Sequence, residues 1–568
     1  MTDLAEPSDR TGSTVEFLAT RKEWRIDDVG GCTLGVLAPQ LDDPTYRHVL
    51  ASNGTARGVI DALAHRTELA AFTHDPHDGF RLHTDANRSY PLYWRRSGDL
   101  VTASDDHRVL AAAAPGEGSA SSVREFAHAG FTVGTRTMYE GVHCAPADAE
   151  IRVDTVHAER WDHSRISLPG HGPLTDLEEA GTVFYDALRE SVDDLATQNP
   201  AATFLLPLSG GSDSRLLAAA LCDVAPDRTV AFTYGTSRSA ETRTSRAVAE
   251  ALGIPWTALE MSPRDIRRRW RSAANAPFLA HAHAGNALPH VQDWYAIALL
   301  HERGTLTSDS IVLPGHTAAR TYSPPAAPPK DGMYGRGELL DALLAQHFNQ
   351  RGDVPTTEPV RSLLVPALSA ELPSSEGHFD ELAAARLIQR FNIQHRQVKY
   401  ILNSVRTYEH HGARWSMPLL SGRCHSALGQ IDWSVRRTKH WYHSLTDREM
   451  NRLAGNRAHG LELAGAGPSG PSAPGNGARG RLRSARPLIR SARGLLRNLH
   501  HPMAFQAYAP SRREYLTALA HRCSPLGVYA EAFLEDRWNP HYRWSDSATW
   551  STPPVTSISR FSVPPATP

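Results

Sequence analysis

Short apolar segments separated by turn residues characterise the first third of the chain. Between residues 70 and 104 they are AAFTH, FRLHTD, PLYWRR and LVTASD, and the turn clusters DPHDG, ANRS and SGD lie between them. This spacing predicts an antiparallel meander in a sandwich. The same pattern of short apolar segments continues in FTVGTRTMYEGVH and AEIRVDT, to about Trp161. We therefore expect a β-rich domain over residues 1–165.

The pattern changes after a Pro/Gly-rich linker over residues 166–176. Thr175 and Glu178 form a capping-box pattern at the start of a helix. Apolar residues then recur at helical spacing, at Leu177, Ala180, Phe184, Leu188, Val192 and Leu195. Next, ATFLLPL and TVAFTYG read as strands, each followed by a helical pattern, SRLLAAALCDV and AETRTSRAVAEALG. This alternation predicts a parallel sheet within a second domain, over residues 177–450.

Helical patterns dominate the later part of the chain, over Arg336–His347 and Glu376–Thr407. A Gly/Ala/Pro/Ser-rich stretch predicts a flexible loop over residues 451–482, and a helical extension with a tail follows over residues 483–568. Seven arginines lie between Arg479 and Arg497, the last four at helical spacing. Such a stripe is either a solvated helix face or a surface for an acidic partner, tRNA or a membrane.

Composition narrows the class of protein. The chain has 568 residues, with 60 Lys and Arg against 61 Asp and Glu, which argues against a uniformly basic nucleic-acid binder. Its five cysteines form no CxxC pair, so neither a disulfide framework nor a zinc knuckle is supported. We find no signal peptide and no apolar run of about 18 residues. We therefore expect a soluble cytoplasmic protein.

One segment has the features of a ligand-binding site, and it lies between the strand ATFLLPL and the following helix. Its residues are Ser209, Gly210, Gly211, Ser212, Asp213 and Ser214. Two glycines between a strand and a helix let backbone N–H groups converge on an anion, and the helix dipole adds partial positive charge. The serine hydroxyls can donate further hydrogen bonds, and the Asp213 carboxylate suits Mg²⁺ on a polyphosphate. The expected ligand is the pyrophosphate part of ATP.

Arg215 follows this loop and has two interpretations. It can add a cationic contact to a phosphate. Alternatively, it faces solvent in the first turn of the helix.

The sequence resembles the asparagine synthetase-like proteins, which are ATP pyrophosphatases with an SGGxDS loop. DANRSYPLYWRRSGDLVTAS and RTMYEGV are similar to that family's class II glutaminase-type domain. TYG with Glu241 and AVAEALGIPW is similar to the second strand and helix of its synthetase domain. KYILNSVRTYE leading to WSMPL is similar to its late core motif.

The resemblance implies two domains. The first is an α+β antiparallel β-sandwich, degenerate and Ntn-hydrolase-like, and the second is an α/β parallel-sheet ATP pyrophosphatase of the adenine nucleotide alpha hydrolase-like type. It implies an amide ligase with ATP and Mg²⁺ as cofactors. A substrate carboxylate attacks the α-phosphate, pyrophosphate leaves into the loop, and an amine attacks the acyl-adenylate. Tyr234 and Gly315 complete the residues expected to bind ATP.

Two departures from the family pattern matter. Glutamine-dependent members begin their mature chain with a catalytic cysteine, whereas Thr2 stands here and Cys32 is the first cysteine. We therefore expect the first domain not to hydrolyse glutamine. In the loop after the strand SIVL, the family's second Mg²⁺ carboxylate is replaced by Ala319 and its glutamate by His316.

His316 also has two interpretations, as a base that accepts the proton of the attacking amine or as a structural or solvated residue. Lys439 is the one visible candidate for a lysine that stabilises the adenylate, and a surface basic helix explains it equally well.

The leading hypothesis is an amide ligase that uses ammonia or an amine of a small-molecule or peptide substrate, as in relatives that form β-lactams or cyclise peptides. The alternatives are a nucleotide-binding pseudoenzyme or scaffold, and an RNA-modifying pyrophosphatase, for which the sequence offers no catalytic cysteine motif. Nucleic acid and membrane partners are not expected, and a homodimer is left open.

Overall fold

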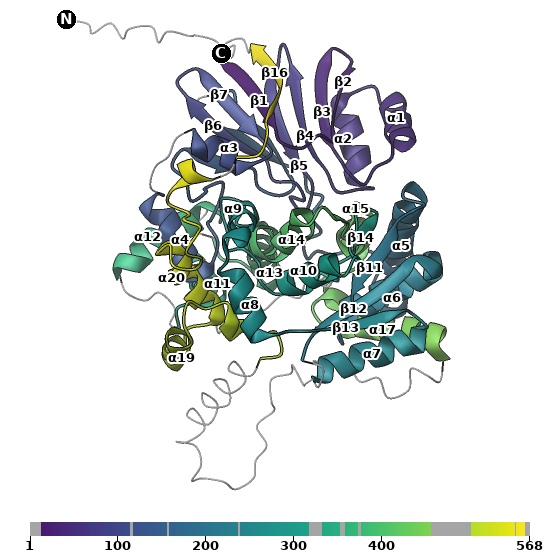
Figure 1. The fold of residues 1–568 in the computed structure, drawn as a ribbon. Coiled ribbons are helices and arrows are strands. Elements are labelled where there is room, and N and C mark those ends of the chain that lie inside the picture. Colours follow the sequence, from purple (N-terminus) through teal and green to yellow (C-terminus); the bar gives the residue numbers. More distant parts are fainter. Residues whose placement is uncertain are drawn as a thin grey trace, which may run out of the picture.

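The computed structural model describes residues 13–113, 118–155, 158–236, 239–316, 332–352, 358–372, 377–455, 501–550 and 552–562. Its strands form three sheets, two built mainly from the N-terminal part of the chain and one from the middle (Figure 1). The predicted domain boundaries and the linker stay predictions.

The first two sheets form a β-sandwich. One has the order β16-β1-β7-β6-β8, and the other has the order β10-β9-β5-β4-β3-β2. Their strands are β1 (Thr14–Ala19), β2 (Trp24–Val29), β3 (Cys32–Leu37), β4 (Ala70–Asp75), β5 (Gly79–Thr84), β6 (Tyr93–Ser97), β7 (Leu100–Ser104), β8 (Val142–Cys144), β9 (Ala149–Arg152), β10 (Glu159–Asp162) and β16 (Thr556–Ser562). Phe17, Phe72 and Phe80 pack between the sheets.

The four predicted strands between residues 70 and 104 are confirmed, but they do not form one meander. β4 and β5 pair antiparallel in one sheet, whereas β6 and β7 pair antiparallel in the other. β1 and β7 run parallel, so the sandwich is not wholly antiparallel. α1 (Asp43–Ser52) and α2 (Ala56–Ala64) pack on the outer face of the second sheet, against β3 and β4 (Figure 1).

The segment FTVGTRTMYEGVH is less regular than the sequence pattern suggests. Only its last residues enter a strand, β8. Gly134 and Gly141 have φ values of 62° and 71°, a left-handed backbone that glycine adopts without steric cost. These two positions interrupt the extended chain and turn it between the sheets.

The third sheet is parallel throughout, as the alternation of strands and helices predicts, with the order β13-β12-β11-β14-β15. Its strands are β11 (Thr203–Pro207), β12 (Thr229–Gly235), β13 (Trp256–Glu260), β14 (Ser310–Val312) and β15 (Arg414–Trp415). Along β11, Phe204 and Leu206 belong to one apolar core and Leu205 to another. Both faces of the sheet are therefore covered, as a parallel sheet requires.

Helices from distant parts of the chain cover one face of the parallel sheet, namely α5 (Leu177–Gln198), α6 (Ser212–Val224), α7 (Ala240–Leu252), α15 (Gly422–Gln430) and α17 (His440–Ala454). The predicted capping box at the start of α5 is wrong. Asp176 is the N-cap and accepts hydrogen bonds from the N–H groups of Glu178 and Glu179. Leu177 is exposed, whereas the other five predicted apolar positions of this helix are buried.

The remaining helices lie toward the other face and toward the sandwich (Figure 1). They are α3 (His107–Ala112), α4 (Ala120–Ala129), α8 (Pro263–Trp270), α9 (Ala276–Ala282), α10 (Trp294–Glu302), α11 (Arg336–His347), α12 (Glu358–Ala370), α13 (Glu381–Phe391), α14 (Arg406–His410), α19 (Arg512–Ala520) and α20 (Pro525–Leu534). The short helix α16 (Trp433–Arg436) lies on the first face, where Val435 belongs to the same core as α5 and α17. Between α13 and α14 the chain continues as a π-helix over Asn392–Ile401 and a 3₁₀ turn over Leu402–Val405.

The C-terminal part of the described chain returns to the sandwich. β16 pairs antiparallel with β1, and Phe561 lies opposite Val15 and contacts the aromatic core (Figure 1). The sequence pattern predicted only helices and a tail here, and α19 and α20 are present. The stripe from Arg479 to Arg497 lies outside the described residues. No helix in the described part of the chain has the length and apolar composition of a membrane span.

Candidate active site

The predicted anion loop lies where the strand order of the parallel sheet reverses. β11 is the middle strand, with β12 and β13 on one side and β14 and β15 on the other. The chain leaves β11 through Leu208–Gly211 and enters α6 at Ser212. In open parallel sheets, ligands bind in the crevice outside the carboxyl ends of the strands at such a reversal. The predicted strand, loop and helix are therefore confirmed, and they occupy a position suited to binding.

Two serine hydroxyls hold the loop in shape. The Ser209 N–H donates to Ser214 Oγ at 3.0 Å, the two hydroxyl oxygens are 2.9 Å apart, and the Gly211 N–H donates to Ser209 Oγ at 3.1 Å. Gly211 is the N-cap of α6 and has no side chain to cap the helix. N–H groups of the first turn therefore have no side-chain cap, which favours an anion at this end.

A cavity of about 220 Å³ opens beside the loop, at the carboxyl ends of β11, β12 and β14. Its wall includes five of the predicted site residues: Ser209, Ser214, Tyr234, Gly315 and His316. Burial raises the pKa of Tyr234 well above its usual value, so this phenol stays protonated near neutral pH. The other predicted residues, Gly210, Gly211, Ser212, Asp213 and Arg215, lie on the loop and the first turn of α6 but are not part of this wall.

Helix α17 supports the loop from behind. The Tyr442 hydroxyl donates to Asp213 Oδ1 at 2.9 Å, and Ser212 Oγ lies 2.8 Å from His443 Nδ1. Burial and the Asp213 charge raise the pKa of Tyr442 well above its usual value, so the phenol remains a donor. The sequence analysis missed both residues, although they follow Lys439 closely. Lys439 itself is exposed at the start of α17 and is not in the cavity wall.

The solvent-facing interpretation of Arg215 is wrong. Its side chain is among the largest that are fully buried, with 1% of the residue exposed. Burial lowers the pKa of this guanidinium from its usual value, with the Asp447 charge acting in the opposite direction. A role for Arg215 in phosphate binding stays a prediction.

The loop after β14 forms another side of the cavity, next to the first turn of α6. Gly315 and His316 follow the strand after Leu313 and Pro314, and His316 Nε2 lies 3.1 Å from Ser404 Oγ in the 3₁₀ turn before α14. The imidazole therefore faces the cavity with a hydroxyl partner. Ala319 and Thr2 lie outside the described residues.

The far wall of the cavity carries acidic groups that were not predicted as site residues. The Tyr408 hydroxyl donates to Asp293 Oδ2 at 2.6 Å, and His290 Nδ1 lies 3.8 Å from Asp293 Oδ1. Asp293 is 5% exposed, and its Oδ1 atom has no hydrogen-bond partner among the described residues. Glu241 also lines this wall, and burial raises the pKa of its carboxyl group. Tyr408 belongs to the late motif, but no spacing in the sequence indicates Asp293.

The comparison with known families agrees with this geometry. Residues 184–285 match the model of the asparagine synthase family, a segment that runs from within α5 past the loop and α7 to Gly285. No curated protein matches the chain. The resemblance to the asparagine synthetase-like proteins seen in the sequence is therefore confirmed for this segment of the chain.

Proposed function

We propose that this protein is an ATP-dependent ligase that adenylates a substrate carboxylate and joins it to ammonia or to a substrate amine, with release of AMP and pyrophosphate. One observation carries the proposal. The loop from Ser209 to Ser214 borders a cavity at the strand-order reversal of a parallel sheet, within a segment that matches the asparagine synthase model. We assign this sheet to the adenine nucleotide alpha hydrolase-like fold and the β-sandwich to a degenerate Ntn-hydrolase-like fold.

The loop suits the departing pyrophosphate. Its backbone N–H groups and the N-terminus of α6 present partial positive charge. Negative charge on the leaving group grows as the bond to the α-phosphate breaks, so these donors bind the transition state more tightly than the ground state. The hydrogen bonds between Ser209 and Ser214 hold the donors in place before ATP arrives.

Asp213 is the residue that we propose as the Mg²⁺ ligand. The Tyr442 hydroxyl fixes the carboxylate at the first turn of α6, and an ionised carboxylate is the donor type that Mg²⁺ prefers. When bound there, Mg²⁺ would supply positive charge to the phosphates.

We propose that His316 accepts the proton of the attacking amine. Its imidazole lies in the cavity wall, and the Ser404 hydroxyl contacts Nε2 and orients the ring. A neutral imidazole takes up a proton near neutral pH, which an amine must lose as it forms an amide.

The acidic wall favours a substrate with a cationic group. Asp293 Oδ1 is a buried acceptor with no hydrogen-bond partner among the described residues, and Glu241 adds a second carboxyl group to the same cavity. A buried acceptor left unpaired is costly, and an ammonium or guanidinium group would satisfy it. We therefore propose that the substrate carries such a group, and that Tyr408 holds Asp293 in the orientation that receives it.

A nucleotide-binding scaffold without turnover is the second candidate. It is favoured by the position of Asp213, whose carboxylate is engaged by Tyr442 and is not part of the cavity wall. The cytoplasmic location expected from the sequence stays a prediction, and a homodimer stays open.

Pyrophosphate release tests the two candidates. The full chain is mixed with ATP, Mg²⁺ and a panel of carboxylates and amines, including amino acids with cationic side chains. The ligase predicts substrate-dependent release that Asp213→Ala abolishes. Release that is unchanged in Asp213→Ala would contradict the metal assignment. ATP binding without release across the whole panel would favour the scaffold.

A further inference from the structure

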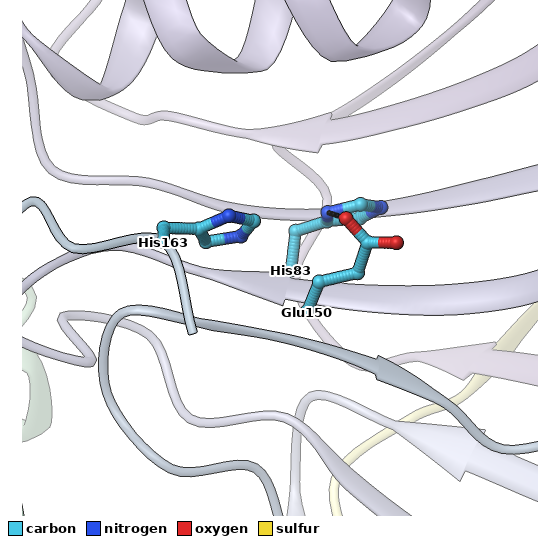
Figure 2. A group of neighbouring side chains, drawn as sticks. All are labelled: His83, Glu150 and His163. Carbon is cyan, nitrogen blue, oxygen red and sulfur yellow. Dashed lines mark ion pairs between the residues drawn. The ribbon is translucent and has the colours of Figure 1, made fainter. Parts of the chain in front are cut away.

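Two histidines and one glutamate meet on the outer face of the β-sandwich, far along the chain from the anion loop. Potential ligand atoms of His83, Glu150 and His163 all lie within 4.8 Å of one another (Figure 2). His83 belongs to β5, Glu150 to β9, and His163 follows the end of β10. These strands are consecutive neighbours in the second sheet.

Strand register explains why these three side chains lie close together. His83 and Glu150 are directly opposite each other in the antiparallel β5 and β9 pair, so their side chains lie on the same face. Glu150 is also opposite Trp161, two residues before His163. Because side chains alternate along a strand, His163 continues on the face of Trp161. The sequence separates these residues by up to 80 positions, so only the folded sheet brings them together.

Two imidazole nitrogens in this group have no hydrogen-bond partner within the described part of the chain. His83 Nδ1 and His163 Nε2 are both buried and unpaired. The His83 side chain is 3% exposed, and its other nitrogen, Nε2, is 2.8 Å from Thr73 Oγ1. Desolvation by burial lowers the pKa of His83 well below its usual value, so the ring is neutral near neutral pH.

The unpaired nitrogen of His83 faces a carboxylate. His83 Nδ1 and Glu150 Oε2 are 3.8 Å apart, too far for a hydrogen bond. When His83 Nε2 donates to Thr73, a nitrogen lone pair therefore faces a carboxylate oxygen. Zinc bonds to imidazole nitrogen and carboxylate oxygen are about 2.0–2.2 Å long, so an ion between the two atoms fits this separation with little movement.

Three arginines lie near the group, Arg57, Arg81 and Arg165, and each pairs with at least one carboxylate. Arg81 pairs with Asp78 at 2.6 Å and with Glu150 at 2.9 Å, and Arg57 pairs with Asp61 at 3.0 Å. Arg57 also contacts Glu150 and lies 2.7 Å from His163 Nδ1. It therefore competes with a cation for two of the three ligands. The same side chains border a cavity of about 670 Å³ whose wall includes His83 and Glu150.

We propose that His83, Glu150 and His163 form a binding site for Zn²⁺ with an open coordination position toward this cavity. Two imidazoles and a carboxylate are a ligand set that Zn²⁺ accepts, and a site with three protein ligands leaves room for water or a small ligand. The Thr73 hydroxyl contacts His83 Nε2 and so orients the ring, while Nδ1 stays available for the metal. A metal-bound histidine usually has such a hydrogen-bond partner on its other ring nitrogen. Arg57 tunes the affinity, since it must release His163 when the ion binds.

Calorimetric titration with Zn²⁺ tests the site. The full, untagged chain is stripped with EDTA and dialysed, and then compared with its variants. Removing a residue that hydrogen-bonds to a metal ligand weakens metal binding about 10–100-fold. His163→Ala and Glu150→Gln remove a ligand itself, so each should weaken Zn²⁺ binding at least about 10-fold. Arg57→Met removes the competing donor and should tighten binding. His83→Ala is less informative because the buried ring also supports folding.

Two control variants make the result specific. His171→Ala removes an exposed histidine that also pairs with a carboxylate, that of Asp432, and should leave Zn²⁺ binding unchanged. Cys32→Ser removes a thiol that lines the same cavity, and it should also have no effect. The site is overturned if His163→Ala and Glu150→Gln bind Zn²⁺ as the unmodified chain does, if Arg57→Met does not bind more tightly, or if Cys32→Ser alone abolishes binding.

Discussion

Gly315 packs directly against Ser214, so closely that a Cβ atom added to Gly315 would lie 3.0 Å from both the Cα and the backbone nitrogen of Ser214. The loop after β14 therefore touches the first turn of α6, with no room for a side chain between them. This contact fixes the distance between the anion loop and His316. The width of the cavity thus depends on a glycine that lies outside the anion loop itself.

Gly315→Ala should impair pyrophosphate release. The new methyl group meets backbone atoms, so either the loop or the start of α6 must shift. A displacement of a few tenths of an ångström moves the donors away from the departing charge, and we expect kcat/KM to fall at least about tenfold. Steady-state kinetics with ATP as the varied substrate measures the change.

Gly337→Ala is the matched control. Gly337 is an exposed glycine within α11, and a Cβ there meets no atom within 4 Å. This change should leave kcat/KM unaltered and stabilise the chain by up to about 1 kcal/mol, because alanine favours the helix. Equal kinetics for Gly315→Ala and Gly337→Ala would show that the contact with Ser214 does not set the geometry of the site.

Tyr442→Phe should weaken the use of Mg²⁺ while leaving the fold intact. The change removes the hydroxyl that donates to Asp213 Oδ1, and a hydrogen bond to a charged group is worth about 1.5–3 kcal/mol. Without it the carboxylate rotates more freely, so we expect a higher Mg²⁺ concentration at half-maximal rate. Pyrophosphate release measured across a Mg²⁺ titration gives this value.

Tyr185→Phe provides a comparison, because Tyr185 in α5 also donates to an aspartate of α6. The Tyr185 hydroxyl donates to Asp223 Oδ2 at 2.7 Å near the other end of α6, away from the cavity. The Tyr185→Phe variant loses the same kind of hydrogen bond as Tyr442→Phe, but its Mg²⁺ dependence should not change. If both variants shift the Mg²⁺ dependence equally, the effect belongs to the stability of α6 and not to Asp213.

His316→Gln should lower kcat with little change in the KM for ATP. General base catalysis by a positioned side chain contributes about 10²–10⁴-fold, and glutamine keeps a polar group at the Ser404 contact without accepting a proton. A His316→Gln variant that keeps the rate of the unmodified chain would exclude His316 as the base.

The anion loop could be predicted from the sequence because its signal is local. ATFLLPL and TVAFTYG are short and apolar on both faces, and the glycines of the loop stand between a strand and a helix. β12 begins and ends at the predicted residues, and α7 ends at Leu252, where Gly253 caps the helix with a left-handed backbone. At these positions, neighbours along the chain decide the structure.

The opposite wall of the cavity and the edge of the sandwich could not be predicted, because both depend on distant partners. Asp293 precedes an apolar helix and gives no periodic signal, and only tertiary packing brings Tyr408 to it. β16 pairs with β1 from the other end of the chain, so an isolated segment TSISRFS reads as part of a tail. The N-cap of α5 was misplaced by one residue because Thr175 and Asp176 are both good capping residues, and only the structure decides between them.

The stability of the fold should decrease in mild acid, and His107 and His283 illustrate the cause. Both are buried, and their Nε2 atoms are 3.1 Å apart. Burial lowers the pKa of His107 to about 3 and that of His283 well below its usual value. The unfolded chain binds protons at both residues below about pH 6.5, while the folded chain does not. Each residue therefore removes up to about 1.4 kcal/mol of stability per pH unit as the pH falls below 6.5.

The melting temperature measured between pH 7.5 and pH 5 checks this sign. We expect it to fall with pH, and to fall less steeply in His107→Gln, because glutamine cannot take up a proton in the unfolded chain. His171→Ala should keep the original slope, since the exposed His171 side chain is 78% accessible and loses little hydration on folding. A melting temperature that rises toward pH 5, or a slope that His107→Gln leaves unchanged, would mean that the buried histidine pair does not govern the acid response. A melting temperature that rises toward pH 5 would point to carboxyl groups with a pKa raised by burial, such as Glu68 and Asp85, because a raised carboxyl pKa adds stability as the pH falls.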